Sequence, residues 1–209
     1  MPPILNVIAA TTFASALSSR SMDPVLPLVA DGFGVSVATA ASLSAVVALT
    51  FAIVQPLLGA AADMFGKPRL MIACLILLGA ANALGAVATS FEMLFASRVL
   101  VGIAAGGTFP IAFGLTGDLV PTAQRQVALS RVLAGAMTGN LLGASAAGVI
   151  GDFLGWRGVL GVLGAIMVVA SVAVMIGFRR GGVASPQRGV SFASLKEGYR
   201  TILHNPNAR

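Results

Sequence analysis

Long stretches of this chain contain no charged residue. Five of them cover residues 33–62, 70–91, 99–117, 132–151 and 158–178, and a sixth, 4–30, is interrupted only by Arg20 and Asp23. An α-helix needs about 20 apolar residues to cross the hydrocarbon core of a bilayer, whereas a membrane-spanning β-strand is about half as long and alternates in polarity. The pattern predicts an all-α membrane protein with six transmembrane helices, over about 4–30, 39–61, 70–89, 92–116, 128–150 and 158–178.

Two short segments recur along the chain at nearly the same spacing. Residues 59–66 and 148–155 both read Gly-x-x-x-Asp-x-x-Gly, and Leu28-x-x-Asp31 is echoed by Leu115-x-x-Asp118. Because three helices per repeat is an odd number, the second copy enters the membrane in the opposite direction. The spacing predicts two inverted three-helix repeats, with chance similarity between Gly- and Ala-rich segments as the alternative.

Composition and charge distribution both suit a bilayer. Of the residues, 57% are hydrophobic and 10% are charged, against about a quarter charged in soluble domains. The net charge is +6, and with the N-terminus inside, ten of the 13 basic residues lie in inner loops and the tail. The positive-inside rule then puts both termini in the cytoplasm. No basic stripe is interleaved with exposed aromatic residues, so a nucleic-acid partner is not expected.

The segment 181–209 is predicted to be a cytoplasmic linker that follows a helical bundle over 1–180. Apolar residues recur in it at helical spacing: Phe192, Leu195, Tyr199 and Ile202. This spacing predicts an amphipathic helix over 191–203 on the membrane surface. A disordered tail is the alternative.

Three ionised side chains lie more than one helical turn inside predicted spans. Arg98 lies seven residues into the fourth span, about 10 Å deep at a rise of about 1.5 Å per residue, and Asp23 lies at a similar depth in the first. Such charges are unfavourable in lipid unless they are paired or hydrated, and Arg20 shares a helix face with Asp23. We therefore expect an Arg98–Asp23 ion pair facing a central cavity, with Arg20 nearby. The alternative is that both charges reach the outer interface.

The loop after the second span resembles a signature of the major facilitator superfamily, Gly-x-Leu-Ala-Asp-Arg-x-Gly-Arg-Lys. The matching residues are Gly59, Ala62, Asp63 and Gly66, with Lys67 as the first basic residue of the closing pair. Departures are Ala61, Met64 and Pro68, and Arg69 stands one place late. The resemblance implies a loop that latches two transporter halves in the outward-facing state. A plain positively charged loop with a helix-capping aspartate is the alternative.

The fourth span carries a second resemblance to that family. Leu94-x-x-x-Arg98-x-x-Val101-Gly102-x-Ala104-Ala105-Gly106 is similar to the family's Leu-x-x-x-Arg-x-x-Gln-Gly-x-Gly-Ala-Ala, with departures at Val101 and Ala104. The resemblance implies that Arg98, together with Arg20 and Asp23, takes part in proton coupling and substrate binding. Gly102 and Gly106 are expected to let another helix pack closely.

Proline and glycine patterns resemble the drug:proton antiporter branch of the family. Pro24-Val25-x-Pro27 is typical of its first helix, which two prolines kink. In the fifth span, small residues at four-residue intervals allow close helix approach: Gly135, Gly139, Gly143, Ala147 and Gly151. The branch's glycine motif is matched at Gly139, Gly143 and Gly148, but Ala144 replaces its proline, which leaves the direction of transport open. A packing stripe without a mechanistic role is the alternative.

The loop after the fourth span, Gly117-Asp118-Leu119-Val120-Pro121-x-x-x-Arg125, also resembles the family. Asp118 and Arg125 are candidates to join Asp63 and Lys67 in an inner charge network. Because exposed ion pairs are individually weak, solvated loop charges are the alternative.

No catalytic constellation accompanies these motifs. The sequence has no Ser/His/Asp set, no metal-ligand spacing and no phosphate-binding loop. We therefore expect no enzymatic activity, no metal and no cofactor, and a proton gradient as the source of energy. The resemblance implies the N-terminal half of a twelve-helix, proton-coupled efflux transporter in the bacterial inner membrane. Its expected partners are the bilayer, a small-molecule substrate and a missing C-terminal half. The alternatives are a half-size transporter acting as a homodimer and a membrane scaffold that does not transport.

Overall fold

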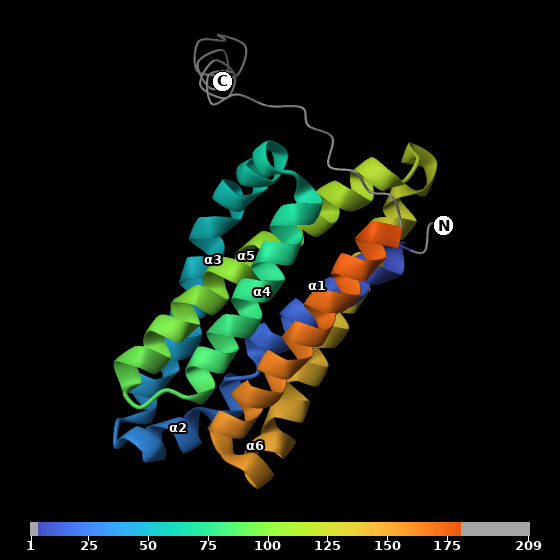
Figure 1. Cartoon of the computed structure of the whole chain (residues 1–209). Coiled ribbons are helices and arrows are strands. Elements are labelled where there is room, and N and C mark those ends of the chain that lie inside the picture. Colours follow the sequence, from blue (N-terminus) through green and yellow to red (C-terminus); the bar gives the residue numbers. More distant parts are fainter. Residues whose placement is uncertain (1–3, 181–209) are drawn as a thin grey trace, which may run out of the picture.

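The computed structural model describes residues 4–180, and over these residues it is helical with no strand. Figure 1 shows long helices packed side by side, with α2 lying across one end. The elements are α1 (Ile4–Arg20), the short 3-10 helix η1 (Asp23–Val25), α2 (Leu26–Phe33), α3 (Val37–Phe65), α4 (Lys67–Ala86), α5 (Phe91–Leu119) and α6 (Thr122–Arg180). The predicted all-α fold is confirmed. The predicted linker 181–209 and its helix over 191–203 lie outside the described residues.

The first predicted span, 4–30, is divided into three helical pieces. α1 ends at Arg20, η1 begins at Asp23 and α2 follows directly. Pro24 and Pro27 are the second residues of η1 and α2. In the first turn of a helix the backbone N–H group, which proline lacks, has no partner within the helix. The prolines therefore break the helix, and Asp23 lies at the start of a new helical turn.

The last two predicted spans form one long element that bends at Gly155. The backbone leaves helical geometry at that residue, with φ 67° and ψ 176°, a region that is readily open only to glycine. Figure 1 shows the chain turning back on itself there. Four helices of the described chain are long and apolar enough to cross a membrane, the last being this bent one: Val37–Phe65, Lys67–Ala86, Phe91–Leu119 and Thr122–Arg179.

The connections between helices gather at two ends of the bundle (Figure 1). At one end, which we call the α3–α4 end, Gly66 joins α3 to α4 with φ 90°, and residues 120–121 join α5 to α6. At the opposite end lie α2, residues 87–90 and the bend at Gly155. Serines cap the helices that start there: Ser36 Oγ accepts from the Thr39 amide at 3.0 Å, and Ser90 Oγ from the Met93 amide at 3.2 Å.

Glycines of the fifth predicted span bring the first arm of α6 directly against α1. A Cβ atom on Gly135 would lie 2.7 Å from the carbonyl oxygen of Ala9, and one on Gly143 would lie 2.5 Å from that of Leu17. Gly139 faces the carbonyl oxygen of Phe13 in the same way. Larger side chains at these positions require the two helices to separate.

The remaining predicted packing glycines differ in how tightly they are enclosed. Gly102 and Gly106 bring α5 onto α3, since Cβ atoms there would lie 2.8 Å from the Val47 carbonyl oxygen and 3.0 Å from that of Phe51. Gly148 has more space, because its nearest neighbour would be Pro24 Cβ at an ordinary 3.7 Å.

Many large apolar side chains lie on the outside of the bundle. They include Leu49, Ile53 and Leu57 on α3 and Met137, Leu141 and Phe153 on α6, the last with 83% of its surface exposed. A soluble monomer rarely leaves so much contiguous apolar surface in water. These faces are suited to lipid or to a further helical domain.

Candidate functional site

A cavity of about 290 Å³ lies between the helices of the bundle. Its walls come from α1, η1, α3, α5 and the first arm of α6, and the lining residues are Ala16, Ser19, Arg20, Asp23, Ser44, Val47, Ala48, Phe51, Phe109 and Asn140. The cavity therefore brings together Arg20 and Asp23, two of the three charged residues predicted for a central site. We call it the Asp23 pocket.

Asp23 is held by two neighbours. Its Oδ1 accepts a hydrogen bond from Ser44 Oγ at 2.6 Å, and its Oδ2 lies 3.5 Å from Arg20 Nη1. The side chains of Arg20 and Asp23 remain 65% and 40% exposed, so their attraction is screened and individually weak. An arrangement of this kind can exchange partners at little energetic cost.

Aromatic rings form the apolar side of the same pocket. Phe51 of α3 and Phe109 of α5 meet edge to face with ring centroids 5.9 Å apart, and Phe113 continues the row 6.5 Å beyond Phe109. Edge-to-face aromatic pairs are favourable and hold fixed geometry. The pocket thus places a carboxylate and a guanidinium beside a rigid aromatic wall.

Arg98 does not pair with Asp23, so that prediction was wrong. The Arg98 side chain is fully buried; its Nε–H donates to Ser97 Oγ at 3.2 Å and its Nη2 donates to Asn82 Oδ1 at 3.4 Å. Its Nη1 has no hydrogen-bond partner, and no carboxylate among residues 4–180 lies within ion-pair distance of it. The alternative, that both charges reach the outer interface, does not hold for Arg98, because its side chain is buried within the bundle.

The physical reason is the direction in which Arg98 points around its helix. Gly85 of α4 leaves room for the guanidinium, because a Cβ atom there would lie 2.8 Å from Arg98 Nη2 and 2.9 Å from Ser97 Oγ. Arg98 therefore turns into the packed space between α4, α5 and α6. We call Arg98 with Asn82, Ser97 and Ser18 the Arg98 cluster, since Asn82 Nδ2 also donates to Ser18 Oγ at 2.8 Å.

At the α3–α4 end, three of the four residues suggested for a charge network come together. Lys67 Nζ lies 2.8 Å from Asp118 Oδ2 and 3.5 Å from Asp63 Oδ1, joining the ends of α3, α4 and α5. Arg125 instead donates to the carbonyl oxygen of Gly117 at 2.9 Å, which caps the last turn of α5. Gly59 is not tightly enclosed, because a Cβ atom there would lie at an ordinary 3.8 Å from Pro110 Cβ.

Arg69, the remaining residue of the predicted latch loop, lies in the first turn of α4. It takes part in no ion pair with another residue of the range 4–180. The ion pairs of this loop are thus formed by Lys67 with Asp63 of the loop and with Asp118 of α5.

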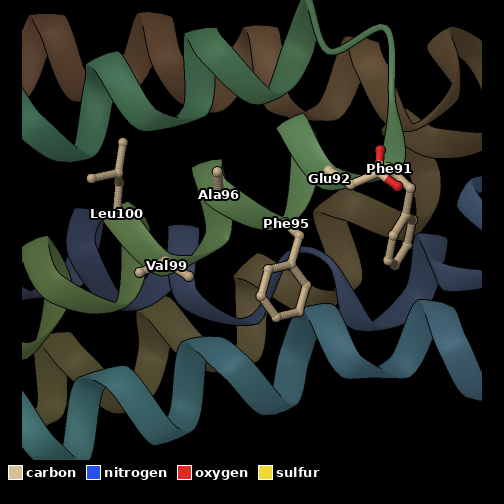
Figure 2. Close-up of a pocket in the computed structure, with 6 residues that line it drawn as sticks. All are labelled: Phe91, Glu92, Phe95, Ala96, Val99 and Leu100. Carbon is tan, nitrogen blue, oxygen red and sulfur yellow. The ribbon is translucent and has the colours of Figure 1, made fainter.

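A larger apolar groove of about 610 Å³ lies along the start of α5. It is lined by Phe91, Glu92, Phe95, Ala96, Val99 and Leu100, and Figure 2 shows Phe91 and Phe95 pointing to one side of the helix and Leu100 to the other. All six residues come from one helix, and none belongs to the predicted site. The groove therefore offers no converging polar groups for recognition.

Sequence reasoning missed several residues that the two polar regions need. Ser44, Phe51, Phe109 and Asn140 complete the Asp23 pocket, and Asn82 completes the Arg98 cluster. The two asparagines carried a usable signal, because each is the only amide side chain within its predicted span. Polar amides in a bilayer-spanning helix usually face protein or a cavity.

Apolar helices long enough to cross a bilayer, arranged around a cavity that holds charged side chains, are typical of integral membrane proteins. Within that class, the chain belongs to the Major Facilitator Superfamily, whose family profile matches residues 8–208. The predicted family resemblance is confirmed.

Proteins similar to the chain include drug-resistance proteins. The Chloramphenicol resistance protein of Streptomyces lividans is 27% identical over 201 residues, which cover 94% of this chain and 51% of that protein. The Quinolone resistance protein NorA of Staphylococcus aureus is 30% identical over 154 residues, covering 71% of this chain and 40% of NorA. The chain spans about half the length of the curated relatives it matches.

Solved structures share the fold. A crystal structure of the peptide transporter POT in complex with sulfate superposes with a TM-score of 0.82 at 18% identity, covering 97% of this chain and 44% of that one. The POT family transporter PepTSo gives a TM-score of 0.78 at the same identity. The arrangement of helices is therefore that of one half of a known transporter architecture.

Proposed function

We propose that the protein exports a small, partly apolar molecule across the bacterial inner membrane in exchange for protons. In this proposal the chain is the N-terminal half of a twelve-helix transporter, with both termini in the cytoplasm. The observation that carries the proposal is the Asp23 pocket, where Asp23 is the only carboxylate among the lining residues.

The lining of the pocket suggests the kind of substrate. Phe51 and Phe109 offer aromatic surface, while Arg20, Ser44 and Asn140 offer hydrogen-bond donors and acceptors at its other side. Ligand sites commonly combine an apolar wall with a few polar groups that fix orientation. The similar proteins are named for resistance to chloramphenicol and to quinolones, and both are compounds with a ring system and polar substituents.

A carboxylate with exchangeable partners offers a route to proton coupling. Ionised Asp23 attracts Arg20 and accepts from Ser44, and protonation removes that attraction. If substrate binding requires the ionised form, substrate and proton exclude each other, and linkage makes this exclusion reciprocal. That relation is what an exchange of substrate for protons requires.

The proposal needs a second wall for the cavity. The chain covers about half of its relatives, and apolar faces on α3 and α6 lie uncovered. A C-terminal six-helix half would close the pocket from the other side. A homodimer of this chain and a scaffold without transport activity are the competing arrangements.

The contacts of Lys67 support the proposed latch. Its ammonium bridges Asp63 and Asp118 and so holds α3, α4 and α5 together at the end that we assign to the cytoplasm. In the proposal, this bridge stabilises one of the two alternating states, and the second half of the transporter binds the same loop.

Transport into proteoliposomes tests the function. The protein at its native length is reconstituted, and uptake of radiolabelled chloramphenicol and of a fluorescent quinolone is measured with and without an imposed pH gradient. We expect the gradient to accelerate uptake of at least one probe in the wild type. In Asp23→Asn, whose neutral amide resembles the protonated carboxyl group, we expect the acceleration by the gradient to disappear while insertion into the bilayer persists.

Asp31→Asn is the matched control, because Asp31 is an exposed carboxylate of α2 outside the pocket. Uptake by this variant should follow the wild type. Equal acceleration by the gradient in wild type and Asp23→Asn would contradict the proposal.

The 209-residue chain, produced alone, distinguishes the arrangements. We expect no flux from it and a cross-linked mass of one copy. Flux together with a two-copy mass would favour the homodimer, and a native-length protein that binds neither probe and carries no flux would favour the scaffold.

A further inference from the structure

Asn82 links Arg98 of α5 to Ser18 in the last turn of α1. Its side chain is fully buried in α4. Its Nδ2 donates to Ser18 Oγ of α1 at 2.8 Å and to the Leu78 carbonyl oxygen at 2.9 Å, while its Oδ1 accepts from Arg98 Nη2 of α5 at 3.4 Å. One amide group thus contacts three helices.

The orientation of this amide is fixed by its neighbours. A guanidinium has no acceptor atom, so only the oxygen of Asn82 can face Arg98. The carbonyl oxygen of Leu78 can only accept, so the nitrogen has to face it. The two requirements agree, and Ser18 then receives the remaining N–H of the amide.

Arg98 depends on few contacts for its position. Among residues 4–180 its two acceptors are Ser97 Oγ and Asn82 Oδ1, both uncharged, and its Nη1 has no partner in that range. A buried cation with only neutral partners is poorly compensated. A small displacement of Asn82 therefore changes a large part of the environment of this guanidinium.

Ser18 lies next to the part of α1 that lines the Asp23 pocket. It lies in the last turn of α1, which ends at Arg20, and its carbonyl oxygen accepts from Ser21 Oγ at 2.9 Å. Arg20 in turn lies 3.5 Å from Asp23. The contacts run from Arg98 through Asn82 and Ser18 to the end of α1 that carries Arg20.

We infer that Asn82 is a positioning residue, which sets the placement of Arg98 according to the state of the Asp23 pocket. The inference rests on the proposed function in one respect, because the state in question is the protonation or occupancy of that pocket. Spatial proximity alone does not establish coupling between sites, so the decisive evidence is a response of Arg98 to a change at Asp23.

The native-length protein, labelled with ¹⁵N-arginine and reconstituted in bilayers, provides that evidence by solid-state NMR. The Arg98 Nε–H signal is identified by its loss in Arg98→Lys. We expect Asp23→Asn to shift this signal when Asn82 is present. The same substitution should leave the signal in place when Asn82 is replaced by leucine, which has the same number of side-chain heavy atoms and forms no hydrogen bond. No shift, or the same shift without Asn82, would overturn the inference.

Two serines one turn apart on α1 supply a matched pair, which also covers the case that Asn82→Leu does not fold. Ser18 and Ser15 are both buried, but within the described part of the chain Ser15 Oγ has no hydrogen-bond partner. Ser18→Ala should shift the Arg98 signal, and Ser15→Ala should not. Equal effects of the two variants would overturn the inference.

Transport separates this inference from the proposed function. In the wild type, exchange of protons for the quinolone or chloramphenicol probe tests the function, whereas the NMR response tests the role of Asn82. If exchange is present, Ser18→Ala and Asn82→Leu should each shift its pH profile and lower uptake about fivefold, the effect of about one net hydrogen bond, with no further loss in the double variant. Additive losses would count against Asn82 acting through Ser18.

Discussion

The Asp23 pocket and the Arg98 cluster both hold an arginine within the helical bundle, and they treat it in opposite ways. Arg20 lies beside a carboxylate and is 65% exposed, whereas Arg98 is fully buried with two uncharged partners. In the Asp23 pocket, exposure allows Arg20 to change partners easily. In the Arg98 cluster, the position of the guanidinium depends on how α4 and α5 pack. The comparison teaches that a charge within the helical bundle can either face an open cavity or be enclosed by packed helices.

The largest effect should follow from removing the charge of Arg98. Arg98→Leu replaces a poorly compensated buried cation with an apolar group, so the free energy of unfolding should stay unchanged or rise by up to about 2 kcal/mol. Gradient-driven uptake should fall by about 100-fold, near the upper range for coupled sites. Thermal unfolding of the purified protein and uptake into proteoliposomes measure the two quantities.

Arg20→Leu is the counterpart in the pocket. Because Arg20 is largely exposed, its replacement should change the free energy of unfolding by less than about 0.5 kcal/mol. Equal changes of stability and of uptake in Arg98→Leu and Arg20→Leu would remove the distinction between the two regions.

Packing around the guanidinium should give the next largest effect. Gly85→Ala places a methyl group 2.8 Å from Arg98 Nη2 and 2.9 Å from Leu160 Cδ1, so we expect a loss of about 1–3 kcal/mol from overpacking. Gly161→Ala is the control, because nothing lies within 4 Å of a Cβ atom at that position. It should be neutral or stabilising by up to about 1 kcal/mol, as read from thermal unfolding; equal losses in both variants would contradict the assigned packing.

The smallest effect should come from a hydrogen bond in the open pocket. Ser44→Ala removes the donor 2.6 Å from Asp23 Oδ1, and we expect gradient-driven uptake to fall about fivefold with stability unchanged. Ser42→Ala on the same helix loses only a bond to the Thr39 carbonyl oxygen outside the pocket. Uptake by Ser42→Ala should match the wild type, and a comparable loss there would show that the pocket bond is not the cause.

Much of the fold could be predicted from the sequence, because charge-free runs of bilayer length leave few arrangements other than spanning helices. The break in the first span was also visible in Pro24 and Pro27. At the α3–α4 end, Asp63, Lys67, Asp118 and Arg125 were candidates for a charge network, and the first three meet. Asp63 and Asp118 lie in the last turns of α3 and α5, and Lys67 starts α4.

The position of Arg98 could not be predicted in the same way. Counting residues from the end of a helix gives a depth in the membrane, and the depths of Arg98 and Asp23 are similar. The count says nothing about the direction of a side chain around the helix axis, which here depends on the space that Gly85 leaves. A charge-only search for partners also passed over Asn82, whose amide supplies the acceptor that Arg98 uses.

Proton movement caused by the substrate itself tests the central claim most directly. Inside-out vesicles containing the native-length protein are acidified internally, and the internal pH is followed as chloramphenicol or the quinolone is added. The account predicts that the probe makes the interior less acid in wild type and Asp31→Asn, and that Asp23→Asn abolishes this change. A pH change of the same size in Asp23→Asn would contradict the account.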